Sequence, residues 1–198
     1  MQKLLLHACC APCSSHCLEQ LCKEYRVTVF YYNPNISLGI EYEKRVAEEK
    51  RLIAAFNEEI SEGKREGTPI DIIEGEYEPE KFYEAVKGLE HLGENSERCY
   101  KCFELRLHET AKLMKDFDLF TTTLTISPLK NAEKLNEIGE ALAAEYGTQW
   151  LYSNFKKKDG YKRSIELSKQ YNLYRQDFCG CAFSKAEAEE RRMKKSEV

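Results

Sequence analysis

The sequence lacks any long apolar run. Of its 198 residues 42% are hydrophobic, yet no stretch approaches the roughly 18 consecutive apolar residues of a membrane-spanning helix. Near the N-terminus only the three leucines at positions 4–6 form an apolar core, which is too short for a secretory signal peptide. Internal repeats, low-complexity tracts and linkers are missing too. We therefore expect a cytoplasmic protein with no membrane partner, folded as one domain over residues 1–198.

An excess of positive charge is also missing. The 30 lysines and arginines are outnumbered by 34 acidic residues, which gives a formal net charge of −4. Proteins that wrap nucleic acids are usually basic overall, so the total charge gives that class no support. One segment departs from this average, because residues 156–175 contain seven basic and two acidic side chains.

Short apolar runs alternate with amphipathic stretches along the chain. β-branched and aromatic residues predict strands, and apolar residues at helical spacing predict helices. The expected strands are residues 3–8, 26–32, 70–74, 119–124 and 150–153. The expected helices are residues 12–25, 40–60, 78–87, 98–115 and 129–146, followed by a helical C-terminal segment. This order predicts an α/β fold, with a parallel sheet of about five strands and helices on both faces.

Cysteine-rich and polar segments follow four of the expected strands. They are residues 9–13, 33–35, 125–130 and 154–160. In open parallel sheets, ligands bind outside the carboxyl ends of the strands. We therefore expect these four segments to meet at one edge of the sheet and to form the functional site there.

Cysteine, in contrast, is abundant, with nine residues in the chain. Seven of them fall in three motifs: Cys9-Cys10-Ala-Pro-Cys13, Cys99-Tyr-Lys-Cys102 and Cys179-Gly-Cys181. Clustered thiols in a reducing compartment are typical of metal sites or catalytic thiols rather than of disulfides. Seven thiols exceed one four-ligand site, which predicts two adjacent metal centres or a cluster beside reactive thiols. Cys17 and Cys22 lie within an expected helix, where we expect them to be buried and structural.

Spacing alone leaves the metal and its chemistry open. Four thiolates bind either a structural zinc ion or an iron–sulfur cluster. Gly180 permits the unusual backbone torsions that would turn the sulfurs of Cys179 and Cys181 inward. Cys10-Ala-Pro-Cys13 also matches a dithiol redox motif, because it follows a strand and opens a helix whose dipole lowers a thiol pKa. Three interpretations thus stay open. They are an iron–sulfur protein, a structural zinc protein that binds RNA, and a thiol–disulfide oxidoreductase that uses Cys10 and Cys13.

Six segments together resemble one protein family: LLLHACCAPCS, YYNPNI, EYEKR, ERCYKCFELRL, TTTLTISPLKN and YRQDFCGCAFS. They extend from residue 4 to residue 184 and resemble the epoxyqueuosine reductases of the QueH type. The resemblance implies reductive deoxygenation of epoxyqueuosine to queuosine in tRNA, the last step of queuosine biosynthesis. It also implies a [4Fe-4S] cluster and an adjacent mononuclear iron without cobalamin, and a fold similar to ATP pyrophosphatase (HUP-like) domains. The electron donor stays unidentified.

The resemblance implies that the clustered thiols are the metal ligands. The expected ligands are Cys9, Cys10, Cys13, Cys99, Cys102, Cys179 and Cys181. We expect the first three of these also to be catalytic. The sequence does not divide the seven between two centres, but our hypothesis places Cys99 and Cys102 in the cluster with some of Cys9, Cys10, Cys179 and Cys181. Asp177 is a candidate additional ligand, with a role at a helix end or turn as the alternative.

Several other residues near the expected edge are candidates for substrate binding. Tyr32 and Tyr100 are candidates for stacking on a splayed base, and Asn33 is a candidate for a hydrogen bond to the base edge. Aromatic residues in strands are more often part of the core, which is the alternative for these tyrosines. Lys130 and Arg106 are candidates for contact with the substrate or its phosphates, or Arg106 tunes the cluster potential through hydrogen bonds to sulfur.

The lysine run after the fifth expected strand is the candidate contact for RNA phosphates. It consists of Lys156, Lys157 and Lys158. An ordinary solvated loop is the alternative interpretation of these three residues.

Overall fold

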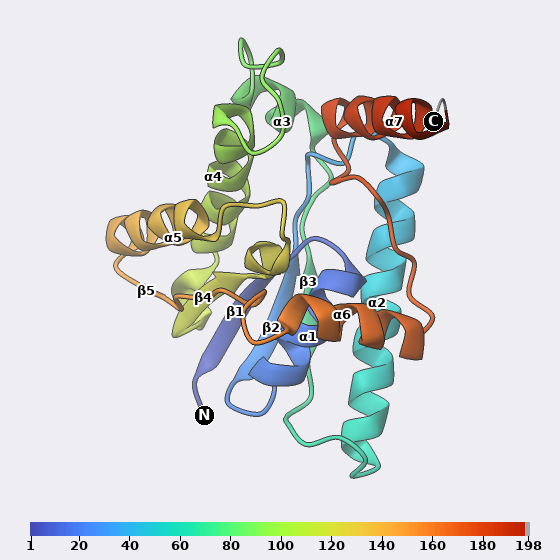
Figure 1. Cartoon of the computed structure of the whole chain (residues 1–198). Helices are drawn as coiled ribbons and strands as arrows, with labels where there is room; N and C mark the ends of the chain where they lie inside the picture. Colours follow the sequence, from blue (N-terminus) through green and yellow to red (C-terminus); the bar gives the residue numbers. More distant parts are fainter. Residues whose placement is uncertain (197–198) are drawn as a thin grey trace.

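The computed structural model describes residues 1–196 and contains a five-stranded, fully parallel sheet (Figure 1). The strands are β1 (Lys3–Ala8), β2 (Arg26–Tyr31), β3 (Asp71–Glu74), β4 (Leu119–Thr122) and β5 (Gln149–Trp150). They lie in the order β3-β2-β1-β4-β5. This arrangement confirms the predicted α/β class and is consistent with the expected HUP-like similarity.

Seven α-helices accompany the sheet in the described part of the chain. They are α1 (Ala11–Leu21), α2 (Gly39–Ser61), α3 (Pro79–Ala85), α4 (Glu97–Ala111), α5 (Ala132–Tyr146), α6 (Gly160–Gln170) and α7 (Ala182–Ser196). Two short 3-10 helices cover Met114–Asp116 and Thr123–Ile126. The expected helix over residues 129–146 begins only at Ala132, because the Asn131 side chain accepts a hydrogen bond from the Lys134 N–H and caps it there.

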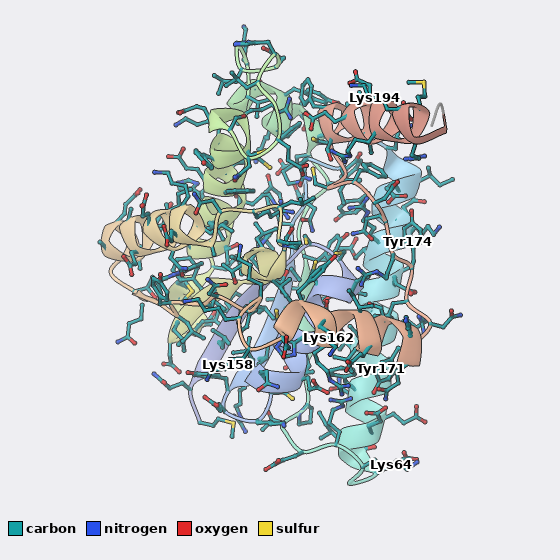
Figure 2. The ribbon with its side chains drawn as sticks, in the orientation of Figure 1. Lys64, Lys158, Lys162, Tyr171, Tyr174 and Lys194 are labelled. Carbon is teal, nitrogen blue, oxygen red and sulfur yellow. The ribbon has the colours of Figure 1, made fainter. Side chains whose placement is uncertain are left out.

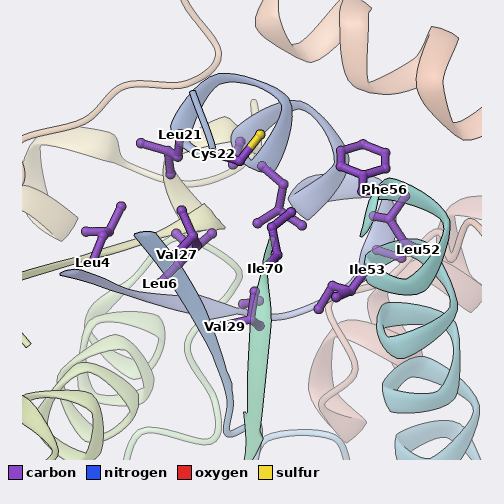
Figure 3. Close-up of a cluster of buried hydrophobic side chains, with 14 of the residues drawn as sticks. Leu4, Leu6, Leu21, Cys22, Val27, Val29, Leu52, Ile53, Phe56 and Ile70 are labelled. Carbon is purple, nitrogen blue, oxygen red and sulfur yellow. The ribbon is translucent and has the colours of Figure 1, made fainter. Parts of the chain in front are cut away.

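Helices cover both faces of the sheet because its central strand is apolar on both sides. Leu4 and Leu6 of β1 belong to the core beneath α1 and α2, together with Phe56 (Figure 3). Leu5 points the other way, into the core that α4 and α5 cover. Each of these leucines is fully buried, and such burial stabilises the fold by about 1.5–3 kcal/mol per side chain.

Two expected strands end two or more residues before their predicted limits. The fourth was expected to reach residue 124, but β4 ends at Thr122, whose hydroxyl accepts a hydrogen bond from the Leu124 N–H and starts a 3-10 turn. The fifth was expected over residues 150–153, but β5 ends at Trp150. Beyond it the backbone of Ser153 hydrogen-bonds the Asn136 side chain instead of a neighbouring strand. In both places, a hydrogen bond to a buried polar side chain takes the place of a backbone hydrogen bond to the neighbouring strand.

The carboxyl edge of the sheet gathers the segments that carry the cysteines. The chain runs outward from β1 to β3 and then returns to β4, so the topological switch point lies between β1 and β4. The loop before α7 crosses this edge, where the Ser37 N–H donates to the Gly180 carbonyl oxygen and Arg45 donates to that of Cys179. Within the described residues, none of the helices combines the length and apolar character needed to cross a membrane.

Candidate metal centre

Three thiols lie together where β1 passes into α1. Cys10 precedes the helix in an extended conformation, and its carbonyl oxygen accepts the N–H groups of Cys13 and Ser14 at 3.1 and 3.0 Å. This tight turn brings the sulfur atoms of Cys9, Cys10 and Cys13 within 4.8 Å of one another. We call these three residues the Cys9 group. Its compactness follows from the local backbone alone.

Four further thiols line one small cavity of about 30 Å³. They are Cys99 and Cys102 on α4, and Cys179 and Cys181 in the loop before α7. We call these four residues the Cys102 group. The sulfurs of Cys179 and Cys181 lie 3.5 Å apart, while Cys102 and Cys181 are buried against Phe82. Gly180 has a φ of 119°, which confirms the unusual torsion predicted between the two cysteines.

The two groups adjoin. A larger cavity of about 210 Å³ is lined by all three thiols of the Cys9 group and also by Cys179 of the Cys102 group. Arg106, Lys130 and Glu94 line both cavities. The structure therefore brings the seven predicted thiols to two neighbouring cavities at the carboxyl edge, and Cys179 lines both.

Arg106 is the buried cation between the two groups, with only 2% of its surface exposed. Its guanidinium lies 4.0 Å from the Cys102 sulfur, donates to Nε2 of His7 at 3.3 Å and donates to Oδ1 of Asn33. Burial, together with the Arg106 charge, lowers the pKa of His7 to about 3, so this histidine is neutral and can accept the bond. Because these hydrogen-bond partners are neutral, the positive charge of Arg106 is not neutralised by them and can stabilise nearby thiolates.

Each group contains one thiol that is favoured as the thiolate. The Cys10 and Cys13 thiols donate hydrogen bonds to Cys9 and, with the charges of Arg106 and Lys130, hold the pKa of Cys9 well below its ordinary value. The Cys181 thiol and the Lys130 charge do the same for the pKa of Cys179. Thiolates are the forms that bind metals, so both groups have a site where binding can begin.

Both groups offer thiol ligands for metal binding. Three sulfurs within 4.8 Å of one another could hold one metal ion. The Cys102 group lines a single cavity with four thiols, of which Cys179 and Cys181 have sulfurs 3.5 Å apart. The nearby charges of Arg106 and Lys130 offset the negative charge of several thiolates.

Asp177, the candidate additional ligand, borders the larger cavity but does not join either group of thiols. Its side chain is 61% exposed, and its carboxylate pairs with Arg192 at 3.0 Å. Its role as a ligand stays a prediction, and the ion pair supports the alternative of a surface turn residue.

The expected base-contacting residues lie elsewhere than the prediction placed them. Tyr32 and Asn33 are buried, and among the described residues neither lines the two cavities. Tyr32 stacks on Phe30 and donates to Glu78, while Asn33 donates to the Ala8 carbonyl oxygen and accepts from Arg106. Tyr100 is half-buried against Phe103. Packing in the core, the alternative stated for the tyrosines, describes their positions, and Asn33 positions Arg106.

The three lysines after β5 do not behave alike. Lys156 turns inward, and its ammonium donates to the carbonyl oxygens of Ser127 and Lys130 at 3.3 and 2.8 Å. Lys157 and Lys158 are exposed. Lys156 therefore anchors the loop after β4, and only the other two are free to meet a phosphate.

Several residues of the larger cavity were missed by the sequence reasoning. Glu94, Tyr161, Arg175 and Arg191 all line it, although none belongs to a cysteine motif. Arg175 could have been identified from the sequence, because it lies in the YRQDFCGC segment that also carries Cys179. The other three lie in a loop, a helix start and a C-terminal helix whose docking the sequence does not reveal.

The match to known proteins covers nearly the whole chain. The family model described as epoxyqueuosine reductase QueH matches residues 4–187. The chain is 41% identical to the epoxyqueuosine reductase QueH of Staphylococcus epidermidis over 186 residues, which is 92% of this chain and 76% of that protein. It is 38% identical to the protein of that name from Streptococcus pyogenes (91% and 69%) and 35% identical to that from Thermotoga maritima (96% and 94%).

Proposed function

This chain belongs to the epoxyqueuosine reductase family QueH, and from that premise we propose how its seven thiols serve the reaction. The protein is an oxidoreductase that acts on epoxyqueuosine in tRNA. In our proposal the Cys102 group holds a [4Fe-4S] cluster and the Cys9 group holds one adjacent iron ion. The observation that carries it is that three thiols lie within 4.8 Å of one another beside the larger cavity, while four thiols line the adjoining smaller one.

Deoxygenation of an epoxide is a two-electron reduction. Both carbon–oxygen bonds break, a carbon–carbon double bond forms, and the oxygen leaves as water after taking up two protons. When bound, the metal centre supplies single electrons from the cluster and a Lewis acid for the epoxide oxygen. The electrons themselves come from a separate donor, and we propose that the reaction takes place in the cytoplasm.

The residues of the chain have distinct tasks in this proposal. Cys9, Cys10 and Cys13 hold their ion next to the larger cavity, where the substrate has room to enter. Lys130 keeps its proton, since the neighbouring thiolates outweigh its burial and raise its pKa, and it donates a hydrogen bond to the substrate there. Arg106 is oriented by neutral His7 and Asn33. It stays protonated, and its positive charge offsets the negative charge of the thiolates.

The thiol–disulfide alternative is not favoured. A dithiol enzyme needs an attacking thiolate with a lowered pKa at the helix start. A hydrogen bond from Cys13 favours the Cys10 thiolate, but its bond to Cys9 and its burial prevail and raise the pKa of Cys10 to about 12. The favoured thiolate is Cys9, which lies outside the Cys10–Cys13 motif.

The test is to purify the full chain without oxygen and to measure metal, sulfide and turnover on the same sample. We expect about five iron ions and four sulfide ions per chain with broad visible absorption. With a chemical reductant, we expect conversion of epoxyqueuosine to queuosine in tRNA, followed by mass spectrometry of the released nucleosides. A colourless protein that contains zinc and no sulfide would support the structural zinc alternative. Turnover that survives removal of all metal by a chelator would support the dithiol alternative.

A further inference from the structure

Many cations of this protein pair with a glutamate. On α2, Arg45, Lys50 and Arg51 each pair with a glutamate at 2.7, 2.5 and 2.7 Å. Lys101, Lys112 and Lys134 on the opposite side of the sheet pair with glutamates as well. Such pairs leave little net field at the surface, because each positive charge has its counter-charge beside it.

Other cations are exposed and have no such partner, and four of these lie on α6 or in the loop before it. They are Lys157, Lys158, Lys162 and Lys169. All four side chains are exposed, and within the described part of the chain none has a hydrogen-bonding, ionic or aromatic partner. We call these four lysines the α6 lysines. On a chain with a net charge of −4, unpaired cations gathered in one place are a specific feature rather than a general surplus.

Acidic groups near the α6 lysines are mostly neutralised. Glu166 and Glu19 both pair with Arg163, at 3.2 and 2.7 Å. Asp159, at the start of the helix, has no such ion pair among the described residues. The face therefore carries a net positive charge, which attracts a polyanion, on a protein whose formal net charge is −4.

Helix α6, which carries two of these lysines, also borders the larger cavity. Tyr161 and Ser164, from the first turns of α6, line the larger cavity. Lys162 and Lys169 are seven residues apart, so they lie on one side of the helix about 10 Å from each other. Figure 2 shows Lys158 before the start of α6, Lys162 on the helix and Tyr171 at its far end. A ligand that rests on this side of α6 reaches the cavity past Tyr161, an exposed aromatic ring of the kind that stacks on bases.

We propose that the α6 lysines bind the sugar–phosphate backbone of the tRNA substrate and hold the modified nucleoside at the mouth of the larger cavity. The proposal rests on the proposed function for the identity of the RNA. RNA is favoured over an acidic protein partner because α6 also borders the cavity proposed to receive the nucleoside, through Tyr161, an exposed ring that can stack on a base. The contacts are to phosphates and so read no sequence.

The test compares two quadruple variants with the same change in charge. One is K157Q/K158Q/K162Q/K169Q, and the matched control is K50Q/K101Q/K112Q/K134Q, which removes four lysines that are paired with glutamates. The affinity of each for tRNA carrying epoxyqueuosine is measured over a series of salt concentrations. We expect the α6 variant to bind about 10–100-fold more weakly near 0.1 M salt, with a slope of log affinity against log salt shallower by about 0.9 per lost contact. The control should differ from the parent protein by less than about threefold.

Kinetic and metal measurements separate this proposal from the proposed function. We expect a raised KM for tRNA in the α6 variant, with kcat at saturating tRNA, thermal unfolding and iron and sulfide content unchanged. Equal tRNA affinity in the parent and the α6 variant, or equal losses in both variants, would overturn the proposal. Unchanged tRNA binding with slower reduction by an acidic donor protein would assign the face to that donor instead. Failure of the parent protein to deoxygenate its substrate would overturn the proposed function, while the binding comparison would still test the α6 lysines.

Discussion

The Cys9 group and the Cys102 group hold the same kind of ligand but are built in opposite ways. Five consecutive positions and one strand-to-helix turn bring together Cys9, Cys10 and Cys13. The Cys102 group needs α4 and the loop before α7, which are far apart in the sequence and meet only in the folded chain. One group thus depends on local backbone geometry, and the other depends on docking.

Hydrogen bonds and an ion pair support the docking of the Cys102 group. Arg45 donates to the Cys179 carbonyl oxygen at 2.9 Å, and the Ser37 N–H donates to the Gly180 carbonyl oxygen at 3.0 Å. Arg98 of α4 pairs with Glu187 of α7 at 3.1 Å. Loss of any of these contacts should therefore disturb the proposed cluster before it disturbs the proposed adjacent iron.

The largest effect is expected from removing one ligand of each group. Cys102→Ala should remove all sulfide and about four iron ions while one iron stays bound, whereas Cys13→Ala should remove one iron and leave the sulfide. Both should slow deoxygenation about 1,000-fold or more, because each metal centre supplies several kcal/mol to the transition state. Iron, sulfide and turnover measurements check this. Cys17→Ala, a change in the core, is the control and should keep both centres; identical metal losses in the two ligand variants would refute the partition.

A second large effect concerns Glu49, which is fully buried on α2 near the Cys9 group. Neither carboxylate oxygen has a hydrogen-bond partner among the described residues, and the neighbouring hydroxyl of Tyr31 has none either. Burial, with a contribution from the Cys9 thiolate, raises the pKa of Glu49 to about 8. The folded protein therefore keeps a proton that the unfolded chain loses above its ordinary pKa, and stability falls as the pH rises towards 8.

Glu49→Gln removes this proton linkage. Between about pH 5 and pH 8 the parent protein should lose up to about 4 kcal/mol of unfolding free energy relative to the variant, at about 1.4 kcal/mol per pH unit. Urea unfolding of both proteins without metal, at several pH values, measures the difference. Parallel stability curves for the two proteins would show that Glu49 is ionised in the folded state.

Arg106 reaches the Cys102 sulfur, and its charge stabilises the Cys9 thiolate, so its replacement should weaken both groups in different ways. Arg106→Gln removes the charge, which should lower the reduction potential of the cluster, because the reduced form carries more negative charge. Arg106→Lys keeps the charge but lacks the fork that reaches Cys102, His7 and Asn33. Both should lose iron to a chelator about 10–100-fold more readily. Redox titration and chelator challenge distinguish the two, with Lys101→Gln on the same helix as the control; a potential that Arg106→Gln leaves unchanged would contradict the assigned role.

The smallest effect is expected at Gly180, between two ligands of the Cys102 group. Its φ of 119° disfavours any side chain, and a Cβ there would lie 2.9 Å from Ile36. Gly180→Ala should cost about 1–2 kcal/mol and speed the loss of sulfide, while the iron of the Cys9 group stays bound. Gly147→Ala is the matched control, since Gly147 has a φ of 64° with open space around it. It should lose similar stability but keep its sulfide, and equal sulfide loss in both would mean that Gly180 matters only through overall stability.

The sequence by itself determined the alternation of strands and helices, the parallel sheet and the Cys9 group. These features depend on periodicity and on spacing within a few residues, which the chain carries locally. The strand ends at residues 122 and 150 could not be predicted, because Asn136 and the Thr122 hydroxyl compete with the sheet for backbone hydrogen bonds.

Only the tertiary structure decided how seven thiols divide into three and four, and which charges face them. Lys156 turns inward while Lys157 faces solvent, although they are neighbours of the same type. Tyr32 and Asn33 pack beneath the site rather than in it. These outcomes depend on which distant side chains meet when α4, α6 and the loop before α7 dock on the sheet. Residue type and spacing do not specify such contacts, because they result from the packing of the whole chain.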